Sequence, residues 1–203
     1  MRDQPTYPGR SLRAACETLA MSVLDRVSAV GPPIDIDLVA DAVGLHYVPI
    51  DFDQTLGMYT RLPAGYRLRG FSGGSRGQAV ALIGTHQHPL RQRFTKAHEL
   101  GHHLIDHPSG WVGRIPPPLR VRYKNPKSDY HYAHEFFAAS LLMPRPWIDA
   151  LGPTAWRRRD VEGLARRFAV TRIAAAARLF EIYGRPTDDI GADINPRELY
   201  RLA

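Results

Sequence analysis

An α+β fold is the class that this 203-residue sequence predicts. Apolar residues recur at helical spacing near both ends of the chain, whereas short apolar runs punctuated by glycine occupy residues 45–84. Hydrophobic residues make up 44% of the composition and charged residues 23%, a balance typical of a globular domain that buries its own core. We therefore expect a small mixed sheet packed on helices.

The beginning of the chain is predicted to form two helices. The first covers residues 11–30, and its apolar stripe includes the single cysteine of the sequence, Cys16, which we expect in the core. The Gly-Pro-Pro that follows ends this helix. The second helix is shorter, because Asp35 or Asp37 can cap its beginning and Gly44 ends it.

The middle of the chain is predicted to form the sheet. Residues 45–51 are expected to form its first strand, and residues 57–62 are expected to pair with residues 66–71 across a Pro-Ala-Gly turn. The clearest strand signal is the Q-A-V-A-L-I run at residues 78–83. Helices then follow at about residues 90–105, 129–142, 160–168 and 171–183, the second of them ended by Pro144.

The most informative feature is the H-E-x-x-H motif of His98, Glu99 and His102, inside the predicted helix 90–105. Residues four apart lie on one face of a helix, so both histidines can bind the same metal ion. Glu99 is next to the first of them, where it can act as general base toward a water on the metal. The motif therefore predicts a metal site of the kind that zinc peptidases use.

Further histidines nearby, His103 and His107, also allow a simpler interpretation, a histidine-rich surface without function. Against it, Phe94, Ala97 and Leu104 give the same helix an apolar face, so we expect the helix to be buried. A buried helix that presents two histidines and a glutamate needs a partner for that polarity. We therefore favour metal binding.

A catalytic zinc site takes three protein ligands and keeps one position for water. The candidates for the third ligand are His131, His134 and Glu135, all in the predicted helix 129–142. His131 and Glu135 are four apart and share a face, with His134 adjacent to it, so spacing alone leaves the choice open. The remaining histidines are expected outside the site: His46, His86 and His88.

Composition excludes several other chemistries. One cysteine cannot build a disulfide framework, a cysteine-rich zinc module or a zinc deaminase. No apolar run approaches the roughly 20 residues that span a bilayer, and the first residues lack a secretory signal, so we expect a cytoplasmic protein without a membrane partner. The formal net charge of +7 favours acidic partners, either nucleic acid or an acidic protein.

Two blocks of the sequence resemble the ImmA/IrrE family of metallopeptidases. Residues 91–104, R-Q-R-F-T-K-A-H-E-L-G-H-H-L, are similar to its signature, and residues 137–144, F-A-A-S-L-L-M-P, are similar to its F-A-x-x-L-L-M-P segment. The resemblance implies a zincin-like metallopeptidase fold in which both histidines of H-E-x-x-H bind Zn²⁺ and its glutamate is the catalytic base. We expect three parts: a flexible arm at residues 1–10, the zincin-like domain at 11–150, and a helical segment at 151–203 packed on it.

The third ligand is where this sequence departs from the family pattern E-x-x-A-N-x-F-A. Alignment on the F-A pair places His131 at the glutamate that binds the metal and Glu135 at the asparagine. The resemblance thus favours His98, His102 and His131 as metal ligands, with Glu135 orienting one of them. In the alternative, Glu135 binds the metal and His131 supports it. A histidine in place of glutamate removes one negative charge from the site.

The resemblance also implies a substrate. Known roles of the family are limited cuts in regulatory DNA-binding proteins, typically helix-turn-helix repressors. We therefore predict a zinc-dependent endopeptidase in which Glu99 activates a water on the metal. The competing hypothesis is a metal-stabilised regulator that binds DNA or a repressor without proteolysis. The oligomeric state is not predicted.

The last two predicted helices resemble a helix-turn-helix. Weak DNA contact is expected through Arg166, Arg167 and Arg172. However, the second helix offers four consecutive alanines, Ala174–Ala177, which cannot read base edges. We therefore favour a pair of helices that packs beneath the peptidase.

Overall fold

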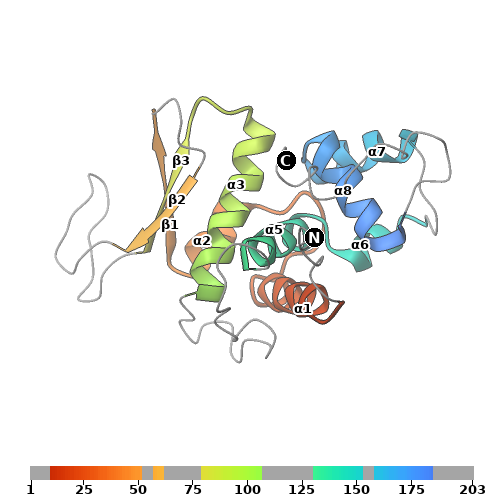
Figure 1. The fold of residues 1–203 in the computed structure, drawn as a ribbon, viewed down its shortest axis with the longest axis horizontal. Coiled ribbons are helices and arrows are strands. Elements are labelled where there is room, and N and C mark those ends of the chain that lie inside the picture. Colours follow the sequence, from red (N-terminus) through yellow and green to blue (C-terminus); the bar gives the residue numbers. More distant parts are fainter. Residues whose placement is uncertain (1–9, 52–56, 62–78, 107–129, 153–157, 185–203) are drawn as a thin grey trace, which may run out of the picture.

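The computed structural model describes residues 10–51, 57–61, 79–106, 130–152 and 158–184 (Figure 1). Helices lie against one face of a small sheet, and a group of C-terminal helices forms the side of the molecule away from the sheet. This arrangement, a mixed sheet packed on helices, confirms the predicted α+β class. No helix in the described part of the chain is long and apolar enough to cross a membrane.

Helix α1 (Arg10–Arg26) ends earlier than the apolar spacing predicts. Ser28 adopts a left-handed conformation with φ of 53°. Its amide donates to the carbonyl of Asp25, and the amide of Ala29 donates to the carbonyl of Leu24, which together close the helix as a Schellman motif. The chain therefore leaves the helix before it reaches the Gly-Pro-Pro that was expected to end it.

The connection into the sheet is as predicted. Asp35 caps α2 (Ile36–Ala42) by accepting from the amides of the next turn, and Gly44, at φ of 76°, provides the turn into the first strand. That strand is β1 (Leu45–Ile50). Its Tyr47 contacts the helix that carries the H-E-x-x-H motif, because the tyrosine hydroxyl donates to the carbonyl of Lys96 at 2.7 Å.

The sheet has the strand order β1–β3–β2, with β2 (Gly57–Arg61) and β3 (Ala79–Gly84) as the second and third strands. Strand β1 pairs parallel with β3, and β2 pairs antiparallel with it. The central strand is buried along most of its length, which explains its continuous apolar run. The expected partner of β2, residues 66–71, lies outside the described residues.

Helix α3 (Pro89–Gly101) begins at His88, whose Nδ1 accepts from the amide of Leu90, and has proline in its first turn. It carries the H-E-x-x-H motif. The predicted helix continues as a π-helix, His102–Asp106. Such widened turns are uncommon and often occur at functional sites.

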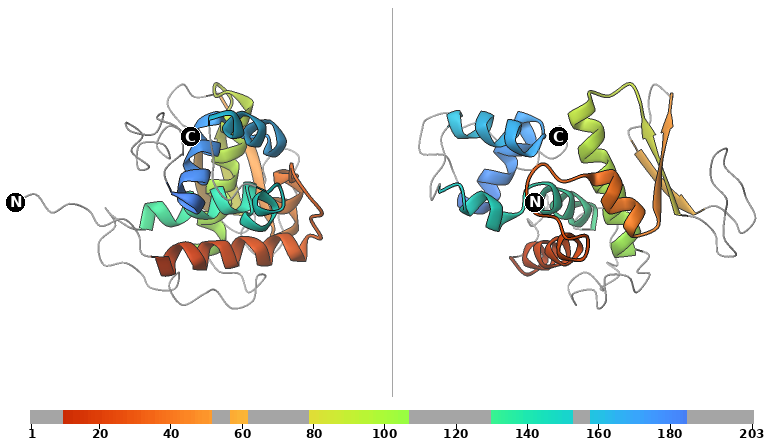
Figure 2. Two further views of the ribbon diagram at one scale, coloured as in Figure 1. Left: turned by 90° about the vertical axis from the view of Figure 1, so that its right-hand side faces the viewer. Right: turned by 180° about the vertical axis from the view of Figure 1, so that it is seen from behind.

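Helix α5 (Tyr130–Leu142) is the predicted helix that follows. Pro144 directly precedes a short helix, α6 (Arg145–Asp149), which was not predicted. Figure 2 shows α5 between α1 and α3. Its side chains Phe136 and Phe137 are fully buried, so α5 is the centre of the helical core.

The predicted core position of Cys16 is confirmed. Its side chain is fully buried on α1, and its thiol donates to the carbonyl of Ala133 on α5 at 3.4 Å. Burial, followed by the negative charge of Glu181, raises the pKa of this thiol well above its usual value. The cysteine is therefore a packing residue and not a nucleophile.

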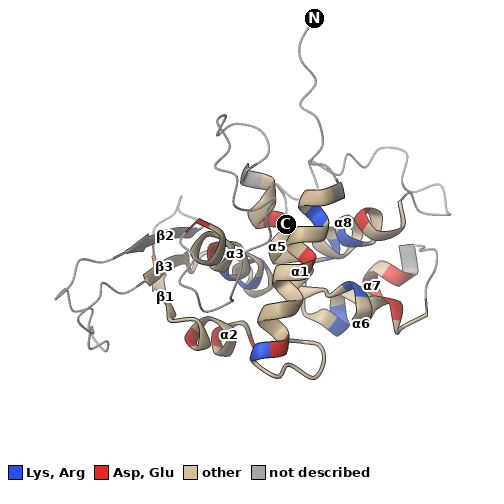
Figure 3. Ribbon diagram, turned by 90° about the horizontal axis from the view of Figure 1, so that it is seen from below, with Lys and Arg blue, Asp and Glu red and all other residues tan. Residues whose placement is uncertain are grey.

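The C-terminal helices α7 (Arg158–Phe168) and α8 (Arg172–Tyr183) pack against each other. Thr171 caps α8 through its hydroxyl, and Gly184 ends it at φ of 79°. Figure 3 shows basic and acidic residues side by side on α6, α7 and α8. This surface therefore carries charges of both signs.

Candidate metal centre

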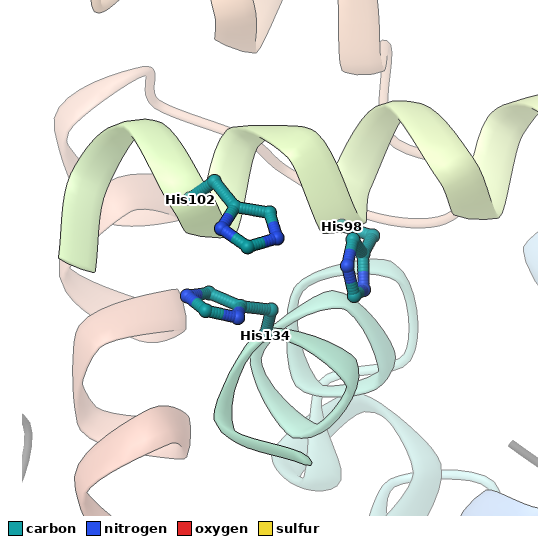
Figure 4. A group of neighbouring side chains, drawn as sticks. All are labelled: His98, His102 and His134. Carbon is teal, nitrogen blue, oxygen red and sulfur yellow. The ribbon is translucent and has the colours of Figure 1, made fainter. Parts of the chain in front are cut away.

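Three histidines meet between α3 and α5 (Figure 4). His98 lies in the last turn of α3, His102 begins the π-helix that continues it, and His134 comes from α5. Each offers one ligand atom, and these atoms lie within 4.8 Å of one another. Figure 4 shows the three side chains gathered between the two helices, with the ring of His134 lying against that of His102. Such a cluster can hold one metal ion.

The rings are packed closely. The centroids of His102 and His134 are 3.7 Å apart with the rings stacked, and the ring of His98 stands edge-on to both, at 5.0 and 5.7 Å. His134 is fully buried, whereas His98 and His102 are partly exposed. The cluster therefore has a protected side at α5 and a side from which water or a ligand can approach.

Asp106, at the end of the π-helix, contacts two of these histidines. Its carboxylate lies 2.8 Å from Nδ1 of His102 and 3.1 Å from Nε2 of His134. A carboxylate that binds one ring nitrogen directs the opposite nitrogen toward a metal and makes it more basic. Asp106 was not predicted as a site residue, although its position four residues after His102 is a signal that could have indicated it.

Glu99 is where the motif requires it, next to His98 on α3, and only 5% of its side chain is exposed. Burial of a carboxylate is unfavourable unless a partner compensates for it. The negative charge of Glu99 contributes, after burial and the charge of Asp37, to raising the pKa of Tyr47 well above its usual value. Tyr47 therefore stays protonated and continues to donate to the carbonyl of Lys96.

The close approach of α3 and α5 depends on Gly101, the glycine of H-E-L-G-H. A Cβ at this position would lie 3.1 Å from Cδ1 of Phe137 and 3.3 Å from Cα of His134. Both distances are tighter than ordinary van der Waals contact, so a larger residue would push α5 away. The glycine thus allows His134 to reach the two histidines of α3.

The predicted third ligand, His131, belongs to α5, but its side chain lies outside the described residues, and the choice of His131 stays a prediction. The third histidine that the structure brings to the pair is His134, one of the candidates that spacing left open. Glu135 is buried, with 5% exposed, and is not part of this three-residue cluster.

The other histidines of the described chain have separate surroundings. His103 is buried and its Nε2 lies 3.1 Å from the carbonyl of Val43, so it joins the π-helix to the end of α2. His46 lies 3.7 Å from Asp41, and His88 caps α3. As expected, none of these is in the cluster.

The residues proposed for DNA contact lie on the C-terminal helices. Arg166 and Arg167 are exposed on α7, and Arg172 lies 3.7 Å from Glu162 in an exposed ion pair. All four alanines of Ala174–Ala177 are buried in α8. The helix that would have to enter a groove of DNA is therefore used for packing over this stretch.

A mixed sheet covered by an H-E-x-x-H helix, with a third histidine delivered from a neighbouring helix, is the architecture of a peptidase domain. The chain belongs to the peptidase family M78: the family model described as the IrrE N-terminal-like domain matches residues 58–180, more than half of its length. The resemblance to the ImmA/IrrE family is thereby confirmed.

The fold is also similar to that of a solved structure described as a Mycobacterium tuberculosis transcriptional regulator. The two share 17% sequence identity and a TM-score of 0.51, over 88% of this chain and 54% of that one. The likeness shows a common fold, and this chain spans about half of that protein's length. No functionally curated protein matches the sequence.

Proposed function

We propose that this protein is a zinc metallo-endopeptidase that makes a limited cut in a regulatory, DNA-binding protein. The observation that carries the proposal is the convergence of His98, His102 and His134 to within 4.8 Å, beside the buried carboxylate of Glu99. Membership in a peptidase family supports the same reaction.

The donor set suits zinc. Three imidazole nitrogens are ligands that zinc prefers, and three protein ligands leave one position of a tetrahedron for water or substrate. We assign the third ligand to His134 in place of His131, because Asp106 lies within hydrogen-bond distance of His134 and of His102. A shared carboxylate of this kind is typical of the partners that orient zinc-bound histidines.

In the proposed reaction, Zn²⁺ supplies a Lewis acid that polarises the scissile carbonyl and lowers the pKa of water. Glu99 takes a proton from the attacking water and passes it to the leaving amine. Its low exposure favours this role, because a carboxylate shielded from bulk water exchanges protons with its immediate neighbours. Asp106 holds His102 and His134 in place during the reaction.

The proposed substrate is a helix-turn-helix repressor. Two facts support it: the family resemblance, and the structural likeness to a protein described as a transcriptional regulator. A net charge of +7 favours encounter with an acidic protein. We propose that the reaction takes place in the cytoplasm, where such repressors act.

The test is the substitution Glu99→Gln. We expect the variant to fold, to bind one zinc per chain and to leave a candidate repressor intact, whereas the unaltered protein cuts it at one site. Repressors encoded beside the gene for this protein are the first candidates. Mass spectrometry of the products would locate the cut. Cleavage that persists in the Glu99→Gln variant would exclude the proposed mechanism.

The alternative function is a metal-stabilised regulator that acts by binding alone. The exposed arginines of α7 are the observation in its favour, because they add positive charge to the surface of a basic protein. If it is correct, binding to a DNA duplex or a repressor is unchanged in the Glu99→Gln variant, and binding to DNA weakens steeply with added salt.

A further inference from the structure

A second recessed site lies between the first turn of α3 and the α7–α8 pair. It is a pocket of about 390 Å³. Figures 1 and 2 show that the two C-terminal helices stand beside the beginning of α3, the same helix whose other end carries the metal-site histidines. The pocket is lined by Leu90 of α3, Glu162, Ala165 and Arg166 of α7, Val170, and Arg172 of α8.

The pocket and the candidate metal centre lie along the same helix. Leu90 and His98 both belong to α3, eight residues apart, which corresponds to roughly 12 Å along the helix axis. An extended peptide covers that distance with about four residues. Phe94, midway between them, is buried in the core, so a bound peptide would pass beside it.

The charges of the pocket favour an acidic occupant. Its lining has two guanidinium groups and one carboxylate, that of Glu162, which lies 3.7 Å from Arg172. Among the described residues, no carboxylate pairs with Arg166. The side chain of Arg172 is 67% exposed, so these charges stand at the mouth of the pocket, above the apolar Ala165 and Val170.

We propose that this pocket is a specificity subsite, which receives an acidic side chain of the protein substrate about four residues from the bond that is cut. The inference rests on the proposed peptidase function. It gives Arg166 and Arg172 a role other than DNA recognition. Both line a pocket together with Leu90 of α3, whereas the alanine stretch of α8 is buried and cannot contact DNA. The substrate class is thus a regulatory protein with an acidic residue close to its cleavage site.

The test measures peptide binding by the full chain. Two fluorescein-labelled peptides of the same sequence are compared, one with a pair of glutamates and the other with glutamines in their place. Binding is followed by anisotropy in the zinc-loaded Glu99→Gln background, so that no peptide is cut. We expect the acidic peptide to bind about two- to fivefold more tightly, the effect of one or two exposed ion pairs.

Four further variants locate the effect. Arg166→Gln and Arg172→Gln should each reduce the preference for the acidic peptide. Arg167→Gln, the matched control one residue along α7 but outside the pocket lining, should keep it. Glu162→Gln should increase the preference, because it removes the carboxylate that competes for Arg172, and a gain of binding cannot result from misfolding.

Two outcomes would overturn the inference. In the first, Arg166→Gln and Arg167→Gln show the same preference for the acidic peptide. In the second, all three arginine variants lose binding to duplex DNA, while their binding of both peptides is unchanged. The result is separable from the proposed function. If the protein cuts its substrate but does not prefer the acidic peptide, the subsite is rejected and the peptidase function stands. If the protein prefers the acidic peptide but cuts no substrate, the peptidase function is rejected and the pocket remains a site that binds acidic peptides.

Discussion

Asp106 contacts two of the three histidines that we propose as metal ligands. Its two carboxylate oxygens each contact a different ring, at 2.8 and 3.1 Å, and those rings come from different helices. One side chain therefore fixes the orientation of His102 and the relative position of His134 at once. It is the last residue of the π-helix and follows His102 by four residues, a spacing that brings two side chains together on one helix face.

Substitution of this residue by asparagine should weaken zinc binding. Asp106→Asn keeps the shape of the side chain but loses the charge that makes the histidines better donors, and loss of such partners typically costs about 10- to 100-fold in metal affinity. Competition with a chelator of known affinity measures the change, and circular dichroism checks the fold. An unchanged affinity would show that the histidines orient themselves.

The choice of the third ligand can be decided by metal content. His134→Ala should lose the bound zinc, because it removes the histidine that faces His98 and His102. His131→Ala should keep one zinc per chain. The opposite result would restore the ligand that the family alignment favours and would mean that His134 only supports it.

At the residue scale, the sequence predicted the pair on α3 because H-E-x-x-H has a fixed helical geometry. Spacing alone could not decide between His131 and His134, since residues three apart on a helix point to nearly the same side, and the family alignment favoured His131. That choice depends on how α5 is rotated against α3, which is set by packing over the whole helix. The four-residue spacing from His102 to Asp106 was visible in the sequence, but the second contact of Asp106, with His134 on another helix, was not.

The contact of α3 with α5 is the element-scale feature that forms the site. The proposed ligands on the two sides of this contact could share one metal ion only at one separation, and Gly101 permits the close approach of the helices. Functional geometries of this type tolerate displacements of only about 0.5 Å. A site made from two helices is therefore sensitive to residues that never touch the metal.

Gly101→Ala should clearly lower the affinity for zinc, whereas its effect on the free energy of unfolding should be small. Alanine favours a helix by about 1 kcal/mol over glycine, which offsets part of the steric cost against Phe137. The matched control is Gly163→Ala on α7, where a Cβ meets nothing within 4 Å. That variant should gain stability and keep its zinc affinity. Equal affinities in the two variants would refute the role of Gly101.

Most elements were predictable from local signals. Asp35, Thr171 and Gly44 cap or end helices through contacts within a few residues, and such contacts are visible in a sequence. The earlier end of α1, the short α6 and the pairing of β2 with β3 were not predicted. These depend on backbone turns or on partners distant along the chain.

For the whole molecule, a buried arginine joins the C-terminal helices to the rest. Arg178 of α8 is fully buried and contacts Glu17 of α1 at 2.8 Å, Glu181 at 2.9 Å and the carbonyl of Met143 at 3.1 Å. The guanidinium therefore connects the end of α8 with α1 and with the end of α5. Each of its three nitrogen atoms donates to one of these acceptors, and such pairing offsets the cost of burying a charge.

Arg178→Ala should destabilise the protein by about 3–5 kcal/mol, because it leaves the carboxylate of Glu181 buried without its cation. Urea unfolding measures the loss. Arg145→Ala provides the comparison: its ion pair with Asp149 is half exposed, at 3.4 Å, and should contribute less than about 1 kcal/mol. Similar losses in both variants would mean that Arg178 does not hold α8 in place.

The hydrogen bond from Cys16 to the carbonyl of Ala133 places the single thiol against the residue that precedes His134, the proposed third ligand. If metal binding orders this part of α5, removal of the metal should make the sulfur more accessible. A disulfide reagent should modify Cys16 slowly in the zinc-loaded protein and faster after a chelator is added. Equal rates would mean that α5 is rigid without metal. If the rates differ, absorbance alone can follow loading and release of the ion.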